Sequence, residues 1–103
     1  MNGVELFEFM RELGIMEKGD GSLYFYDMVK MVARGDYTPL EAVRETKHQL
    51  HLKYDTELYA IVKPCINHLL LLDDAELESL GLHLEKRTTT GLIAAFAEFF
   101  RTH

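Results

Sequence analysis

The segment KGDGSL at residues 18–23 carries residue types found in a calcium-binding loop of the EF-hand kind. If Gly21 takes the sixth position of such a loop, only Asp20 and Asp27 fall where a carboxylate could bind the ion. Calcium takes about six to eight oxygen ligands, and an EF-hand loop usually closes with a bidentate glutamate. The segment therefore predicts a turn between two helices and not a metal site.

The histidines and the single cysteine are the other candidates for metal or nucleophilic chemistry. His48 and His51 could share one helix face, but no third ligand is fixed by spacing, and a structural zinc ion takes about four ligands. Cys65 falls in an apolar stripe, which indicates a small buried residue and not a reactive thiol. No glycine-rich phosphate loop, nucleophile elbow or acidic pair is readable. We therefore predict no enzyme, no metal, no cofactor and no small-molecule substrate.

Composition indicates one acidic globular domain. The chain has 103 residues, 48% of them hydrophobic, and 11 basic against 17 acidic side chains give a net charge of −6. An acidic surface repels the phosphates of nucleic acids and of anionic lipids. The longest apolar run, Leu69–Leu72, is too short to span a membrane, the N-terminus does not resemble a secretory signal, and a lone cysteine is typical of a reducing compartment. We expect a single cytoplasmic domain over 1–103 without a membrane partner.

Capping signals delimit most of the helices that we predict. Thr38-Pro39-Leu40-Glu41 combines a threonine cap, a proline at the first helical position and a glutamate three after the cap, which is a capping box. This helix should run to about Leu52. Asp73 and Glu76 form a second box for a short helix through Leu80. The other predicted helices are Gly3–Leu13 after the cap Asn2, Leu23–Arg34 after the cap Ser22, and Gly91–Arg101 after the threonines 88–90, with glycines 14, 35 and 81 as terminators.

Residues 49–72 are typical of a helix, a tight turn and a second helix. The second helix should begin at Asp55, with Asp55 and Thr56 as caps, and run to Leu72. Apolar residues recur there at steps of three and four: Leu58, Ile61, Val62, Cys65, Ile66 and Leu69. Pro64 predicts a kink or two short helices. A helix–turn–helix at about 39–72 is the usual device for placing a helix in the DNA major groove.

The predicted fold class is all-α: a single compact domain of about six helices with an embedded helix–turn–helix. The apolar positions that share the inward faces of these helices predict the core. The predicted core residues are Phe25, Val29, Leu50, Leu58, Val62, Ile66, Leu69, Ile93 and Phe96.

Three collinear segments resemble one family. Residues 11–15, RELGI, are similar to its His-Glu-Ile-Gly-Val motif, and the turn at 53–56, KYDT, is similar to its Lys-Lys-Phe-Asn-Thr. Residues 86–94, KRTTTGLIA, are similar to its Lys-Pro-Thr-Asn-Ser-Glu-Phe-Ile-Ala. The chain thus resembles, over about residues 6–101, the C-terminal effector domain of the sporulation master response regulator of spore-forming Gram-positive bacteria.

The resemblance implies an all-helical, stand-alone domain that controls transcription by binding DNA, without the receiver domain that precedes the effector in the full regulator. The arginines of the family's recognition helix fall here on Ile61, Pro64 and Asn67. Because a bidentate arginine–guanine contact contributes about 1–3 kcal/mol of discrimination, we expect weak or altered DNA binding. The residues left as candidate DNA contacts are Lys53, Thr56, Lys63, Asn67 and His68.

A second hypothesis is that the domain does not bind DNA. The acidic charge, the missing arginines and the apolar residues around 61–72 favour a degenerate relative that acts as a protein-interaction module or a homodimer. A helix that is apolar on several faces must be covered on more than one side. If the rest of the chain does not cover it, the exposed patch marks an interface.

Overall fold

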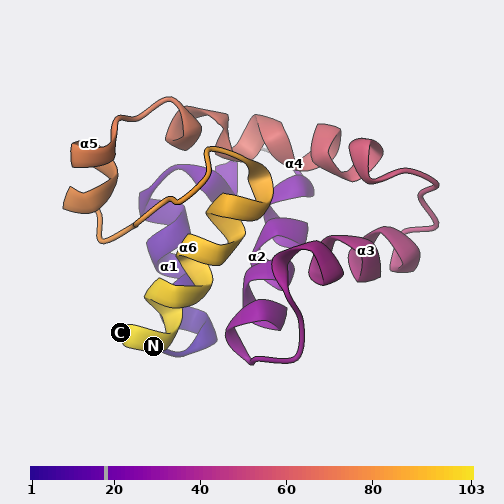
Figure 1. Ribbon diagram of the computed structural model, residues 1–103, viewed down its shortest axis with the longest axis horizontal. Coiled ribbons are helices and arrows are strands. Elements are labelled where there is room, and N and C mark those ends of the chain that lie inside the picture. Colours follow the sequence, from indigo (N-terminus) through magenta and orange to yellow (C-terminus); the bar gives the residue numbers. More distant parts are fainter. Residues whose placement is uncertain (18) are drawn as a thin grey trace.

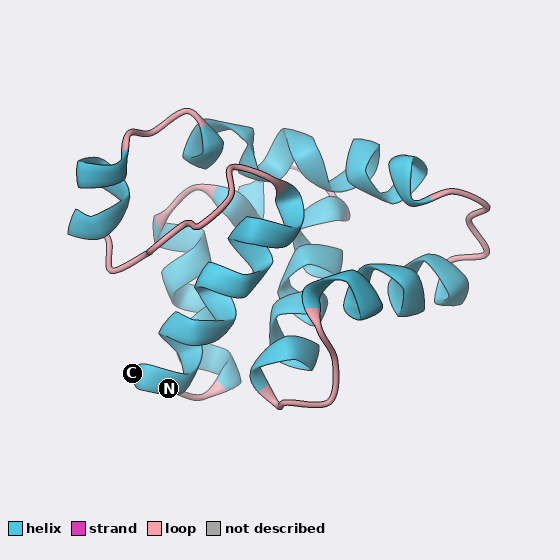
Figure 2. Cartoon of the chain, in the orientation of Figure 1, coloured by secondary structure: helices cyan, strands magenta, loops and turns pink. Residues whose placement is uncertain are grey.

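The computed structural model describes residues 1–17 and 19–103, and these form helices, turns and loops without a strand (Figure 2). The all-α prediction is therefore confirmed for the described residues. The helices, shown in Figure 1, are α1 (Gly3–Glu12), the short 3-10 helix η1 (Ile15–Glu17), α2 (Gly21–Ala33), α3 (Pro39–Gln49), α4 (Asp55–Leu70), α5 (Asp74–Ser79) and α6 (Thr89–Thr102). The turn predicted at 18–23 lies partly outside the described residues, since these omit Lys18.

Local hydrogen bonds explain where α3, α5 and α6 begin. The Glu41 amide donates to Thr38 Oγ1 over 3.2 Å, and the Thr38 amide donates to Glu41 Oε1 over 2.9 Å. Asp73 and Glu76 make the same reciprocal pair at 2.8 and 3.4 Å. Thr88 caps α6 by accepting the Gly91 amide. These predicted caps are confirmed, as are the terminating glycines 14, 35 and 81, whose φ angles are 78°, 84° and 84°.

Helix α2 begins two residues before the predicted start, so the assignment of Ser22 as its cap is wrong. Ser22 lies buried in the first turn, and its hydroxyl donates to the Gly19 carbonyl over 2.9 Å. The reason is tertiary, because a Cβ on Gly21 would lie 2.2 Å from the Ile61 carbonyl oxygen. The absence of a side chain at Gly21 lets the start of α2 pack directly on the backbone of α4.

The start of α4 also differs from the prediction. Tyr54 is the cap residue, and neither Asp55 nor Thr56 caps the helix. The Glu57 carboxylate accepts the amides of Lys53 and Tyr54 at 3.1 and 2.9 Å. Asp55 instead pairs with Lys47 of α3 over 2.9 Å, so a cation from the neighbouring helix draws its carboxylate away from the helix end.

Pro64 lies inside α4, which is continuous over Asp55–Leu70. The prediction of two short helices is therefore wrong, while a kink at this point stays a prediction. Proline removes the hydrogen bond to the carbonyl four residues earlier, that of Ala60. Both Ala60 and Pro64 are exposed, so water can satisfy this carbonyl on the outer side of the helix.

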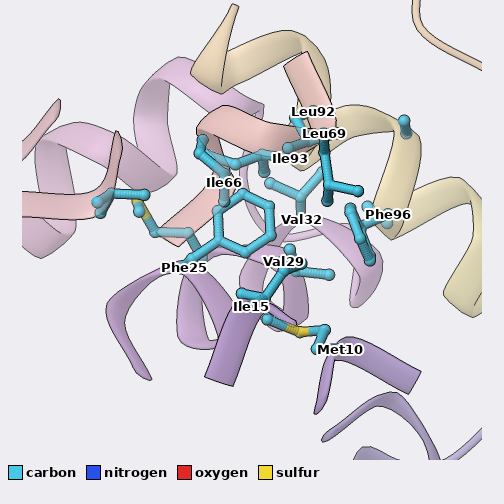
Figure 3. Close-up of a cluster of buried hydrophobic side chains, with 14 of the residues drawn as sticks. Met10, Ile15, Phe25, Val29, Val32, Ile66, Leu69, Leu92, Ile93 and Phe96 are labelled. Atoms are coloured by element: carbon cyan, nitrogen blue, oxygen red, sulfur yellow. The ribbon is translucent and has the colours of Figure 1, made fainter. Parts of the chain in front are cut away.

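Helix α2 lies at the centre of the molecule and packs against α3, α4 and α6. Figure 3 shows the core around Phe25 and Phe96, whose rings meet edge to face with centroids 5.5 Å apart. Arg101 joins α6 to the end of α2, because its guanidinium donates to the carbonyls of Val32 and Ala33 at 2.8 and 3.2 Å. Every predicted core residue is buried except Leu50, the C-cap of α3, which is half-buried at the edge of the core.

Candidate interface on helix α4

The connection between α3 and α4 spans residues 50–54, and the two helices run in opposite directions in the view of Figure 1. The amide of His51 donates to the His48 carbonyl, and the amide of Leu52 donates to the Lys47 carbonyl. This bonding closes the helix as a Schellman motif, with His51 at φ 57° in the position that glycine usually takes. Helix α3 therefore ends three residues before the predicted Leu52. Because His51 lies beyond the helix, it does not share a helix face with His48.

Three of the five predicted DNA contacts lie together on the outer side of α4. Thr56, Lys63 and Asn67 are all exposed, and their spacing of seven and four residues keeps them within about 40° on the helix. Ala60 lies beside them and adds little bulk. The buried residues of α4 occupy the opposite side: Leu58, Val62, Cys65, Ile66 and Leu69.

The other two predicted contacts lie elsewhere. His68 is about 100° around the helix from Asn67, and its Nε2–H donates to the Leu13 carbonyl over 2.6 Å, which ties α4 to the end of α1. Lys53 precedes α4, where its ammonium lies 5.3 Å from the centre of the Tyr54 ring. The structure therefore gathers three of the five residues into one face, which we name the α4 face: Thr56, Ala60, Lys63 and Asn67.

The α4 face is nearly neutral and carries a single formal charge, that of Lys63. The acidic residues of α4 point away from it, since Asp55 and Glu57 are about 80–100° around the helix from the nearest of Thr56 and Asn67. Asp55 is also neutralised by Lys47. The face can therefore donate and accept hydrogen bonds, but it lacks the cationic density that phosphate backbones attract.

A second exposed feature begins where α4 ends. Leu71 is 78% exposed, the largest value among the big hydrophobic side chains, because α4 stops at Leu70 and not at the predicted Leu72. Arg87 holds this end, since its guanidinium donates to the carbonyls of Leu70 and Leu72 and pairs with Asp74 over 2.8 Å. The acidic side chains that follow Leu71 are Asp73, Asp74, Glu76 and Glu78. We name Leu71 with these four residues the acidic end.

Two hollows lie on the described surface, and sequence reasoning predicted neither because each is formed by segments that are distant in the sequence. The larger, of about 690 Å³, lies between the α2–α3 connection and α6, with Tyr37, Leu40 and Ala94 among its walls. The smaller, of about 380 Å³, lies at the start of α6 against α4. Its lining is Tyr59, Lys63, Leu70, Arg87 and the threonines 88–90.

Burial in the wall of the smaller hollow raises the pKa of Tyr59. The negative charge of Asp55 acts in the same direction, and Arg44 opposes both. The phenol therefore stays protonated at neutral pH and can donate a hydrogen bond.

Comparisons with protein-family models, curated proteins and solved structures found no match. Within the described residues, no helix combines the length and apolar character needed to cross a membrane. Fold and surface together define an all-α domain that presents one polar helix face and one acidic, apolar-tipped end.

Proposed function

We propose that this domain regulates transcription by contacting duplex DNA weakly through the α4 face. The observation that carries the proposal is that Thr56, Lys63 and Asn67 lie on one exposed face of α4, the helix that follows α3 after a short connection. Each is a side-chain type that contacts DNA, and asparagine can bond an adenine edge in a bidentate manner. The small side chain of Ala60 beside them would allow DNA to approach the helix closely.

The charge of the face sets the expected strength. Two of the predicted contacts, Lys53 and Lys63, are cations, and neither forms an ion pair with another described residue. About two phosphates would therefore be neutralised. The logarithm of affinity then falls with the logarithm of salt concentration with a slope of about −2. Weak binding with a shallow dependence on salt is also what we expect from Ile61, Pro64 and Asn67, which stand where the resembled family has arginines.

Fluorescence anisotropy with a mixed-sequence duplex at several salt concentrations tests the proposal. Lys63→Gln should lower the slope by about one unit, because one phosphate contact is lost. Asn67→Ala should weaken binding at all salt concentrations without changing the slope. The matched control is Lys86→Gln, which removes an exposed lysine outside α4. Equal effects of the two lysine substitutions, or no binding at low salt, would rule out the α4 face as a DNA-binding surface.

The acidic end favours a second candidate function, the binding of a basic protein segment with an apolar anchor. Leu71 would contact the anchor, while Glu76 and Glu78 would attract lysines or arginines. Two-fold pairing of identical copies would bring like-charged α5 helices together at this end, so charge disfavours a homodimer there. Within the described residues, Asp74 is the only one of these acids that forms an ion pair, and its partner is Arg87.

A synthetic helical peptide that presents one leucine among lysines tests this candidate by calorimetry. Leu71→Ser should abolish binding, and Glu78→Gln should weaken it and reduce its salt dependence. A version of the peptide with glutamates in place of lysines is the control. Light scattering on the wild type tests the alternative of a homodimer. A concentration-dependent dimer that Leu71→Glu disrupts would show that the partner at this end is a second copy of the chain and not a basic segment.

A further inference from the structure

We propose that the larger hollow, between the α2–α3 connection and α6, binds an uncharged and mainly apolar small molecule. Its volume of about 690 Å³ lies within the range of about 300–1,000 Å³ that is usual for ligand pockets. The hollow lies where α3 packs against α6 (Figure 1). The proposal does not depend on DNA binding, because none of the four residues of the α4 face lines this hollow.

Small side chains on one side of α6 leave the space for a ligand. Gly91, Ala94 and Ala95 line the hollow, and their spacing of three and four residues places them on the same side of the helix. Glycine is required at the first of these positions, since a Cβ there would lie 2.0 Å from the Lys86 carbonyl oxygen. Ala94 is exposed, which makes it the position from which the hollow can be filled by substitution.

Apolar residues around the start of α3 form the opposite wall. Tyr37, Pro39 and Leu40 line this side, and Val32 at the end of α2 also contributes. Tyr37 and Pro39 are half-buried, whereas Leu40 keeps 41% of its surface exposed. A ligand that covers this wall removes apolar surface from water, which is the main favourable contribution to the binding of apolar molecules.

Hydrogen bonds hold the walls in place before a ligand binds. The Arg101 guanidinium donates to the carbonyls of Val32 and Ala33 at 2.8 and 3.2 Å and so fixes α6 to the end of α2. The reciprocal bonds between Thr38 and Glu41 fix the first turn of α3. A preformed site loses less conformational entropy on binding than a site that must be ordered by its ligand.

The charges of the lining favour an uncharged ligand. Glu85 and Glu98 are acidic and Lys86 and Arg101 are basic, so the formal charge of the lining residues is zero when His83 is counted as neutral. Glu98 and Arg101 also pair with each other over 3.2 Å. An ion of either sign would therefore give up its hydration without meeting a net opposite charge. A molecule without a charge does not incur this cost.

The surroundings of the hollow favour a small molecule over a second protein chain. A specific protein–protein interface buries about 800 Å² on each partner. Of the large hydrophobic side chains that are exposed in the described structure, Leu40 lines the hollow, and the others lie outside its lining: Val4, Leu23, Tyr54, Ile61 and Leu71. The apolar surface available here is therefore confined to the hollow, which suits a ligand that fits inside it.

Fluorescence titration with N-phenyl-1-naphthylamine, an uncharged probe whose emission rises in apolar surroundings, tests the proposal. Amide chemical shifts of the ¹⁵N-labelled chain locate the probe, and we expect saturable shifts at Leu40, Gly91 and Ala94. Ala94→Phe should weaken binding at least about tenfold, because the loss of contact with two buried CH₂ groups already changes an affinity by about that factor. Ala75→Phe adds the same ring to an exposed alanine of α5 outside the hollow and should leave the affinity unchanged.

A charged probe built on the same rings, 8-anilinonaphthalene-1-sulfonate, tests the chemical class. It should bind at least about tenfold more weakly than the uncharged probe, because its sulfonate must be desolvated. Equal or tighter binding of the sulfonate would overturn the assignment to an uncharged ligand.

Three results would overturn the site itself. The first is the absence of shifts at Leu40, Gly91 and Ala94, and the second is equal weakening by Ala94→Phe and Ala75→Phe. The third is a concentration-dependent dimer that Ala94→Phe disrupts, which would assign the hollow to a second copy of the chain. Spectra of each variant without probe identify any loss of fold, and the smaller substitution Ala94→Leu then provides the same test.

Discussion

Replacement of Phe96 by alanine tests how α6 is joined to the rest of the molecule. Phe96 is 0% exposed, and its ring lies 5.5 Å from the Phe25 ring in an edge-to-face arrangement and 5.7 Å from the Phe9 ring. Three helices therefore meet at this side chain. Truncation of a fully buried phenylalanine costs about 3–5 kcal/mol, through lost transfer free energy and the cavity that remains. A domain of this size has about 5–15 kcal/mol of stability in total.

Urea unfolding followed by circular dichroism measures this change. The midpoint should fall by on the order of 2 M, because small domains lose about 1–3 kcal/mol of stability per molar urea. Phe7→Ala is the control. Phe7 is half-buried, and among the described aromatic residues its ring contacts that of Tyr26 alone, so we expect less than half the effect. A midpoint equal to that of the wild type for Phe96→Ala would refute the packing of α6 on α1 and α2.

Two further predictions concern single contacts. Gly91→Ala should lower the melting temperature although alanine favours helices, because the added Cβ would lie 2.0 Å from a backbone oxygen; an unchanged or higher melting temperature would contradict this close approach. The hydrogen bonds from Thr38 lower the pKa of Glu41, so its contribution to stability is present above the pKa of the unfolded chain and is lost as pH falls through the lower folded pKa. The difference in melting temperature between the wild type and Glu41→Gln should therefore vanish in acid, and a difference that persists there would show that the carboxylate charge is not involved.

Sequence reasoning was most accurate where both partners of an interaction are close in the chain. Thr38 and Glu41 lie three residues apart, so their box forms as soon as α3 forms. Ser22 and Asp55 carry equally good capping groups, yet neither caps its helix. The close contact of Gly21 with the backbone of α4 shifts the start of α2 to an earlier residue. The ammonium of Lys47 in α3 forms an ion pair with the Asp55 carboxylate. Local propensity could not reveal these contacts, because each depends on a helix elsewhere in the sequence.

The same division holds for the candidate sites. Thr56, Lys63 and Asn67 share a face because of helical periodicity, which can be read from their spacing. The side chain of His68 is equally suitable for contacting DNA, but its imidazole donates a hydrogen bond to the Leu13 carbonyl at the end of α1. The larger hollow could not be foreseen, because its lining joins Leu40 of α3 to Ala94 of α6.

The amino-acid sequence alone therefore determined the helical class, the buried stripes and the capping boxes, because helix periodicity and caps act over three or four residues. The tertiary structure decided which polar groups have partners elsewhere in the chain. Packing gives His68, Asp55 and Arg87 partners that are 13 or more residues away or on another helix, whereas Lys63 forms no ion pair with any described residue.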